Sequence, residues 1–63
     1  MKVNGNVMEL KGRTIMDLLA QMGLRQDCTA VSVNGDIVQR ALHGEFTLNE
    51  DDVVEVVSFV GGG

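Results

Sequence analysis

The hydrophobic residues of this chain recur with two different spacings, which divide the sequence into strands and one helix. Between Ile15 and Met22 the apolar residues lie three and four positions apart, as they do on one face of a helix. Elsewhere, short apolar segments alternate with polar residues or consist mainly of valine, which is typical of β-strands. The pattern predicts two strands, a helix, two more strands, an irregular segment and a last strand.

Two Asn-Gly pairs mark the turns of the predicted hairpins. Asn4-Gly5 lies between short apolar segments of the first ten residues, and Asn34-Gly35 lies inside AVSVNGDIV. This pair favours a two-residue type I′ turn, because both of its residues tolerate the positive φ angles that the turn requires. We therefore expect one hairpin before the helix and a second hairpin after it.

The predicted helix has signals at both ends. The hydroxyl of Thr14 can accept a hydrogen bond from the backbone N–H of Asp17, and the carboxylate of Asp17 suits the positive end of the helix dipole. Gly23 can take the left-handed conformation that ends a helix, and Leu24 can close over that end. These signals predict a helix between Thr14 and Gly23.

The segment from Gln39 to Asp52 is the least regular part of the sequence. Because it has no sustained period, we expect a loop with one short helical turn. Its apolar residues Leu42, Phe46 and Leu48 are expected to hold the loop against the core.

The last strand, DVVEVVSFV, is expected to be central because it is long and mostly valine. Alternation divides it into two faces. The face expected to cover the helix carries Val54, Val56, Ser58 and Val60. The outer face carries Val53, Glu55, Val57 and Phe59, since Glu55 belongs in water. Exposed Val57 and Phe59 would form a docking patch for a partner, although they could instead complete the core.

The composition favours one small globular domain. The chain has 63 residues, of which 44% are hydrophobic, and one layer of strands on one helix is the simplest arrangement that buries its apolar faces. The predicted fold class is α+β, a mixed sheet of four to five strands packed on one helix. Residues 1–60 would form the domain, and residues 61–63 a flexible glycine tail.

Charge and hydropathy restrict the partners and the location. The net charge is −4 and the basic residues are scattered, so binding to nucleic acid is not expected, whereas a basic protein partner is plausible. No apolar run is long enough to cross a membrane, and no secretory signal is recognisable. We expect a soluble cytoplasmic protein with no membrane association.

The three glycines that end the chain point to chemistry at its terminal carboxylate. Gly61, Gly62 and Gly63 form the slimmest possible polypeptide, able to enter a channel that larger residues would block. A carboxylate resists nucleophilic attack until ATP converts it to an acyl phosphate or acyl adenylate. A sulfur donor would then give a thiocarboxylate, and a thiol or an amine would give a thioester or an amide. The alternative is a frayed end without function.

The whole chain resembles the ThiS sulfur carriers of thiamine biosynthesis, which belong to the ubiquitin-like β-grasp group. The resemblance rests on the first Asn-Gly hairpin, the helix start TIMDLL, the segment VSVNGDIVQR and the ending DDVVEVVSFVGGG. Gln39 and the turn Glu50-Asp51-Asp52 depart from the usual family pattern, which affects turns and not chemistry.

The resemblance implies a carrier that acts as a co-substrate and is not itself an enzyme. A ThiF-like enzyme would use ATP to adenylate Gly63, and sulfur from a cysteine desulfurase system would convert it to a thiocarboxylate. Thiazole synthase would then take the sulfur. Gly61 and Gly62 would thread the tail into these enzymes, Val57 and Phe59 would dock on them, and the carrier would bind no cofactor and be a monomer when free.

Two other functions fit the same features. The small subunit of molybdopterin synthase shares the fold and the terminal glycines, although that family tends to be longer. A ubiquitin-like modifier or binding domain would use the fold without transferring sulfur. The mass of the protein purified from its own cells would separate the two sulfur carriers, in which one oxygen is replaced by sulfur, from a modifier, which forms larger isopeptide conjugates.

Other candidate residues carry weaker signals. Cys28 is a lone thiol with no nearby histidine or basic cluster, so we interpret it as structural or incidental. His43 has no second ligand at a metal-binding spacing, which predicts a solvated loop residue and no metal site. The carboxylates of Glu50, Asp51 and Asp52 are expected to form a hydrated turn.

Overall fold

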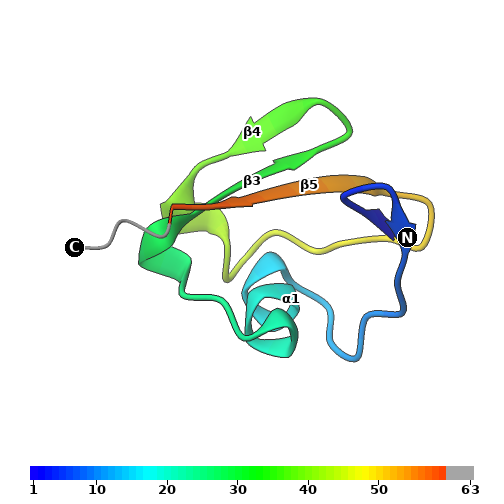
Figure 1. The fold of residues 1–63 in the computed structure, drawn as a ribbon, viewed down its shortest axis with the longest axis horizontal. Helices are drawn as coiled ribbons and strands as arrows, with labels where there is room; N and C mark the ends of the chain where they lie inside the picture. Colours follow the sequence, from blue (N-terminus) through cyan, green and yellow to red (C-terminus); the bar gives the residue numbers. More distant parts are fainter. Residues whose placement is uncertain (60–63) are drawn as a thin grey trace.

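The computed structural model describes residues 1–59, which form a five-stranded mixed sheet covered on one face by a helix (Figure 1). The sheet order is β2-β1-β5-β3-β4. The predicted α+β, ubiquitin-like fold is therefore confirmed, with the strands, the main helix and the short helical turn before the last strand in the predicted order, whereas the helical turn at Gln26–Cys28 was not predicted. The elements are β1 (Lys2–Val3), β2 (Asn6–Val7), α1 (Ile15–Met22), η1 (Gln26–Cys28), β3 (Thr29–Val33), β4 (Asp36–Val38), η2 (Arg40–Leu42) and β5 (Val53–Ser58).

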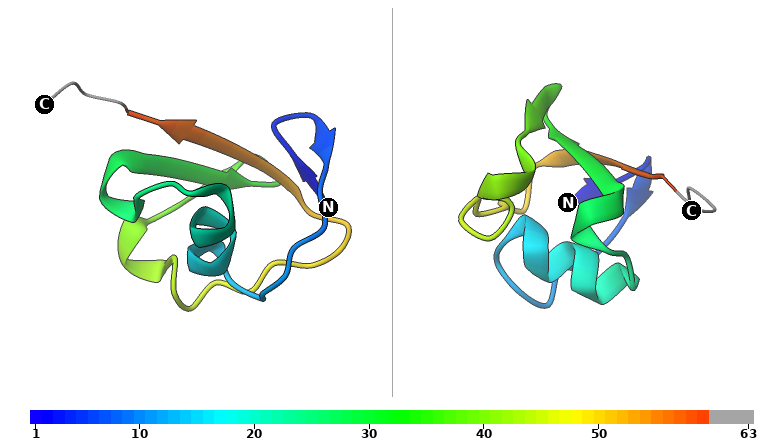
Figure 2. Two further views of the ribbon diagram at one scale, coloured as in Figure 1. Left: turned by 60° about the horizontal axis from the view of Figure 1, so that its bottom comes forward. Right: turned by 90° about the vertical axis from the view of Figure 1, so that its left-hand side faces the viewer.

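The last strand occupies the centre of the sheet, as its valine-rich sequence predicts. β5 pairs in parallel with β1 and in antiparallel with β3. Figure 1 shows β5 running along the length of the molecule, with the short β1–β2 hairpin near one end and the longer β3 strand beside it. In the views of Figure 2 the helix lies under one face of this sheet, and the opposite face is left without a covering layer.

Both Asn-Gly pairs form the predicted turns. Asn4 and Gly5 have φ angles of 52° and 84°, and Asn34 and Gly35 have φ angles of 52° and 89°. Positive values at both turn positions are the signature of a type I′ hairpin, whose twist matches that of the flanking strands. The two turns therefore fix the register of β1 with β2 and of β3 with β4.

The helix begins with a complete capping box. The N–H of Asp17 donates to the Thr14 hydroxyl at 3.2 Å, while the Asp17 carboxylate accepts from the N–H groups of Arg13 at 2.8 Å and Thr14 at 3.0 Å. The bond from Arg13, followed by the one from Thr14, holds the pKa of Asp17 below its usual value. Gly12 passes so close to Asp17 that a Cβ atom at this position would collide with the aspartate side chain. At the other end Gly23 has a φ of 74° and forms the predicted left-handed cap.

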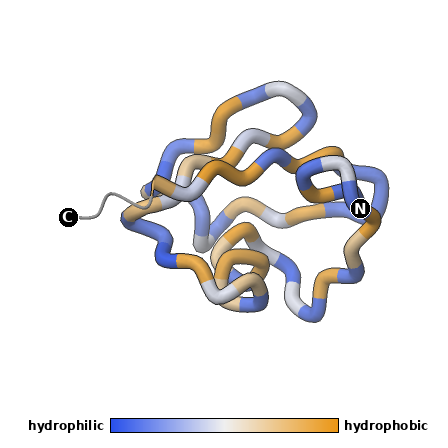
Figure 3. Tube along the Cα trace, in the orientation of Figure 1, coloured by the Kyte–Doolittle hydropathy of each residue, from blue (hydrophilic) through white to orange (hydrophobic). Residues whose placement is uncertain are grey.

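The core lies between α1 and the inner face of the sheet. Ile15, Leu18 and Leu19 of α1 are almost fully buried against inward-facing valines of the strands. In Figure 3 the orange, hydrophobic residues concentrate in the strands and the helix, while much of the blue lies in the turns. The strand and loop residues that complete the core are Val3, Val31, Val33, Val38, Leu48, Val54 and Val56.

The segment between β4 and β5 contains the predicted short helical turn, η2, but the structure corrects which side chains it buries. Leu48 is buried and Phe46 is partly buried, as expected, whereas Leu42 is 44% exposed. His43, expected in solvent, is only 1% exposed. The tight turn of η2 directs Leu42 outward and carries the next side chain inward.

One ring nitrogen and the backbone carbonyl of His43 form hydrogen bonds in this buried position. Its ring Nε2 lies 3.2 Å from the carbonyl oxygen of Val38, and its own carbonyl accepts from the N–H of Met16 at 3.0 Å. Nδ1 of the ring has no hydrogen-bond partner among residues 1–59. The histidine thus links the start of α1 to the end of β4 as a structural residue.

The predicted domain boundary after residue 60 and the glycine tail at residues 61–63 lie outside the described residues. Among the residues that are described, no helix combines the length and the hydrophobicity required to span a bilayer.

Candidate functional site

β5 is the last strand before the terminal glycines, for which the sequence predicts chemistry at the carboxylate, and contacts on both of its sides hold this strand in the sheet. On one side β5 pairs with β3 from Val54 to Ser58, and the N–H of Phe59 donates to the carbonyl of Cys28 at 2.6 Å. The strand is therefore held on this side as far as the last described residue.

On the other side, β1 is too short to pair with the whole of β5, and a side chain continues the ladder. The backbone pairing ends where the N–H of Asn4 donates to Val54 at 2.9 Å. Beyond it the carboxamide of Asn4 binds both backbone groups of Val56: Oδ1 accepts from the N–H at 2.8 Å, and Nδ2 donates to the carbonyl at 3.2 Å. A primary amide has the same donor and acceptor groups as a peptide unit, so Asn4 replaces the missing strand residue.

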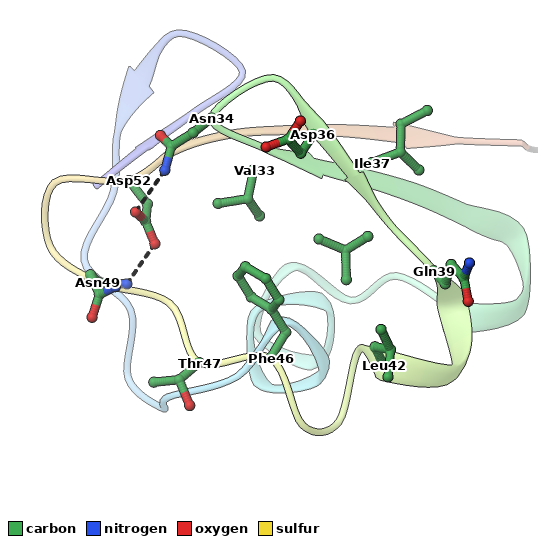
Figure 4. A pocket seen from close by; sticks show the side chains of 11 residues that line it. Val33, Asn34, Asp36, Ile37, Gln39, Leu42, Phe46, Thr47, Asn49 and Asp52 are labelled. Carbon is green, nitrogen blue, oxygen red and sulfur yellow. Dashed lines mark hydrogen bonds between the residues drawn. The ribbon is translucent and has the colours of Figure 1, made fainter.

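Asn34 fixes the start of β5 in a similar way. Its Oδ1 accepts from the N–H of Val53 at 3.0 Å, and its own N–H donates to the Val53 carbonyl at 2.8 Å. Its Nδ2 donates to Asp52 at 3.0 Å, while the second carboxylate oxygen of Asp52 accepts from the N–H of Asn49 at 2.8 Å (Figure 4). The first residues of both hairpin turns are therefore attached to the central strand.

The prediction that all three carboxylates of the acidic turn stay hydrated is wrong for Asp52. This residue is only 8% exposed, because the donors from Asn34 and Asn49 occupy both of its oxygens. Glu50 and Asp51 are exposed, as expected. Asp52 thus has the predicted role of a turn former, with its charge compensated by hydrogen bonds instead of water.

An open groove lies beside this turn, between the β3–β4 hairpin and the segment from Phe46 to Asn49 (Figure 4). Its lining mixes the apolar side chains of Ile37, Leu42 and Phe46 with polar groups from both sides. Residues 1–59 contain no group of three or more His, Cys, Asp or Glu side chains placed to hold a metal ion.

The two faces of β5 differ as the alternation predicts. Val54 and Val56 are buried against the core, whereas Val57 is 55% exposed and Phe59 is 57% exposed. The alternative that Val57 and Phe59 complete the core is therefore wrong. Both are exposed and shortly precede the terminal glycines in the sequence, and their role in docking stays a prediction.

The exposed apolar surface is wider than the sequence indicated, because Ile37 of β4 is 81% exposed. The pairing register places Ile37 opposite Ser32 of β3, and Ser32 opposite Glu55 of β5. Opposite residues of antiparallel strands point to the same face, so Ile37 belongs to the same outer face as Val57. Alternation within Asp36–Val38 could have revealed this residue, since its neighbour Val38 is buried.

One remaining candidate, Cys28, is the last residue of η1 and directly precedes β3. Cys28 is partly buried, and its backbone carbonyl accepts the hydrogen bond from the N–H of Phe59. Next to it the guanidinium of Arg25 lies 2.9 Å from the carboxylate of Asp27 and lowers the pKa of that carboxyl group through its hydrogen bond. Gly61, Gly62 and Gly63 lie outside the described residues.

Comparison with known proteins gives consistent results. The model of a family described as the ThiS family matches residues 1–63. The sulfur carrier protein ThiS of Bacillus subtilis strain 168 is 42% identical over 50 residues, which are 79% of this chain and 76% of that protein. A thiazole synthase of Magnetococcus marinus is 42% identical over 52 residues, which are 82% of this chain but only 16% of the larger protein.

The fold agrees with a solved structure from the same group. The crystal structure of a thiamine biosynthesis protein, ThiS, from Geobacter metallireducens superposes with a TM-score of 0.79 at 29% sequence identity. The match covers 98% of this chain and 96% of the other. With a family model that spans its full length and a close relative of similar size, the chain belongs to the ThiS family.

Proposed function

We propose that this protein is a sulfur carrier of thiamine biosynthesis and that its reactive atom is the carbonyl carbon of Gly63. The observation that carries the proposal is the match of the ThiS family model to residues 1–63, which includes the terminal glycines. The relative named a sulfur carrier and the solved ThiS structure support the same function. The proposal requires Gly63 to be the C-terminal residue of the mature chain.

The reaction has two steps at this carbon. An oxygen of the Gly63 carboxylate attacks the α-phosphorus of ATP, pyrophosphate leaves, and an acyl adenylate forms. A persulfide of the sulfur donor then attacks the carbonyl carbon and displaces AMP, which gives an acyl disulfide. A second thiol attacks the donor cysteine's sulfur, forms a disulfide with it and releases the thiocarboxylate on Gly63. ATP binds to the activating enzyme and not to the carrier.

In this proposal the folded domain holds the last strand in place and offers a docking surface, while the partner enzymes catalyse the reaction. β5 is held on its β3 side as far as Phe59, so the chain has a defined position up to two residues before the first terminal glycine. Exposed Val57 and Phe59 offer apolar surface to an enzyme that receives the tail. Gly61 and Gly62 lack side chains that would obstruct a narrow channel.

The partners we propose are a ThiF-like adenylating enzyme, a cysteine desulfurase system as the sulfur source, and thiazole synthase as the acceptor. Support for the last comes from the thiazole synthase of Magnetococcus marinus, part of which is similar to this chain. Similarity within one polypeptide is consistent with two activities that work on the same intermediate.

Adenylation in vitro tests the proposal. The purified protein is mixed with ATP and the ThiF-like enzyme of the same organism, and pyrophosphate exchange is measured. We expect exchange with the wild type and none with Gly63→Trp, because the indole would block the channel that receives the tail. Lys11→Trp, an exposed position outside β5, is the control and should react normally. Exchange at the normal rate with Gly63→Trp would contradict the proposal.

A further inference from the structure

The outer face of the sheet is hollowed along its β3 strand. The outward residues of β3 are small, Ala30 and Ser32, while the strands on either side carry larger ones. Ser32 pairs with Ile37 of β4 on one side and with Glu55 of β5 on the other, so three side chains form one row across the sheet. The lining of this hollow consists of Ala30, Val31, Ser32, Gly35, Ile37, Val53, Glu55 and Val57.

The walls of the hollow are apolar and uncovered. Ile37 is 81% exposed on one wall, and Val53 and Val57 are 49% and 55% exposed on the other. In the described part of the chain, these residues are therefore among the largest apolar surfaces open to a partner. A partner that covers them would gain hydrophobic stabilisation.

Glu55 places a negative charge on the same wall, between Val53 and Val57. Its side chain is exposed, and the salt bridge formed within residues 1–59 is between Arg25 and Asp27, so Glu55 is left without a cation in that range. A purely apolar partner would remove water from this carboxylate without supplying a hydrogen bond or a positive charge, which is unfavourable. The hollow thus favours a partner group that is apolar along its length and positive at its end.

An arginine side chain has these properties. β4 and β5 are the two neighbours of β3, so they lie about 10 Å apart, twice the usual spacing of strands, which leaves room for one extended side chain over the small residues of β3. The methylene stem of arginine packs on apolar surface, and its planar guanidinium binds a carboxylate through two parallel hydrogen bonds. Lysine offers a point charge without this geometry.

We propose that this hollow receives an arginine side chain of the enzyme that adenylates the carrier, with Glu55 as its anionic partner. The inference rests on the proposed function and adds the chemistry by which the enzyme recognises the body of the carrier. The net charge of −4 also favours this binding, because it attracts a basic surface of the enzyme.

Affinity measurements with charge variants test the ionic part. Binding of the ThiF-like enzyme of the same organism is measured by calorimetry with the wild type, Glu55→Gln, Glu55→Lys and, as a control of equal charge change, Glu45→Lys. Glu45 is exposed and lies in the loop after η2, away from the hollow. We expect Glu55→Lys to weaken binding about tenfold or more, Glu55→Gln to weaken it less, and the control to stay within about twofold.

Filling the hollow tests its shape. Ser32→Leu adds apolar surface, so a partner that needs only a hydrophobic patch would bind equally well or more tightly. A partner that inserts a side chain would be blocked, and we expect binding about tenfold weaker. Circular dichroism melting of each variant shows whether the body is still folded, and Ala30→Leu serves if Ser32→Leu does not fold.

A charge reversal in the enzyme identifies the partner residue. Each surface arginine of the enzyme is replaced by glutamate, and one such variant should bind Glu55→Lys better than it binds the wild-type carrier. If binding of Glu55→Lys is instead restored when a lysine of the enzyme is replaced by glutamate, the partner residue is not an arginine and this inference is wrong. It is also wrong if both Glu55→Lys and Ser32→Leu bind normally to an enzyme that adenylates the wild type. A wild-type carrier that is neither bound nor adenylated would overturn the proposed function as well.

Discussion

The carboxamide of Asn4 forms two hydrogen bonds with the backbone of Val56, a residue 52 positions away in the sequence. One is accepted from the N–H at 2.8 Å and the other is donated to the carbonyl at 3.2 Å. This side chain belongs to the first hairpin turn, yet it secures the strand that leads to the terminal glycines. A turn residue is thereby part of the sheet.

Replacing Asn4 by aspartate should destabilise the fold by about 1 to 3 kcal/mol, because a carboxylate oxygen would face the Val56 carbonyl where an N–H now donates. Aspartate tolerates the positive φ of this position, so the turn itself is kept. The free energy of unfolding in urea measures the effect. Asn6→Asp, an exposed residue of β2, is the matched control and should change stability by less than about 0.5 kcal/mol. Equal losses of unfolding free energy in the two variants would show that the hydrogen bonds of the Asn4 amide do not contribute to stability.

His43→Ala should cost about 2 to 4 kcal/mol of unfolding free energy, since it empties a fully buried site and removes the bond to the Val38 carbonyl. Glu45→Ala, two residues along the same loop and exposed, should be close to neutral. Chemical denaturation of both variants gives the comparison. A His43→Ala protein as stable as the control would mean that the ring is not part of the core.

The acid stability of the protein should depend on Asp17. Hydrogen bonds from Arg13 and Thr14 lower its pKa in the folded state below the ordinary value of 3.8, so its stabilising contribution is complete above that value and is lost as the pH falls through the folded pKa. The unfolding free energy should therefore fall less steeply on acidification in Asp17→Asn than in the wild type. Asp51→Asn, which removes an exposed aspartate outside the cap, should keep the steep dependence. Parallel curves for the wild type and Asp17→Asn would contradict this assignment.

The features predicted correctly from the sequence are those determined by neighbouring residues. The Asn-Gly turns, the Thr14–Asp17 cap and the glycine at the end of the helix each depend on a few consecutive positions. The alternation within β5 needed only the assumption that Glu55 faces water, and it placed Val57 and Phe59 correctly on the surface.

The features that were missed depend on contacts between distant segments. Nothing near Asn4 or Asn34 shows that their amides reach β5, because the sequence does not state that β1 stops short of its neighbour. His43 and Asp52 are polar, and their burial becomes favourable only when Val38, Asn34 and Asn49 supply hydrogen bonds.

Phe59→Ala should weaken binding to the adenylating enzyme about tenfold while changing the unfolding free energy by less than about 1 kcal/mol, because the ring is 57% exposed. Val7→Ala is the control, since Val7 is also an exposed apolar residue but lies in β2 at the far edge of the sheet. Calorimetry measures binding, and urea denaturation measures stability. Unchanged affinity in Phe59→Ala, or unfolding of that variant, would rule out the docking role.

The intact mass of the protein, purified from its own cells under conditions that preserve thioacids, is the decisive test of sulfur transfer through Gly63. We expect a chain that ends at Gly63 and, in part of the population, a mass increase equal to the replacement of one oxygen by sulfur. Fragmentation should place this increase on Gly63, and a protein that lacks Gly62 and Gly63 should not acquire it. A population that never carries sulfur, that is joined to other proteins through an isopeptide bond, or that continues beyond Gly63 without processing would show that the protein is not a sulfur carrier acting through Gly63.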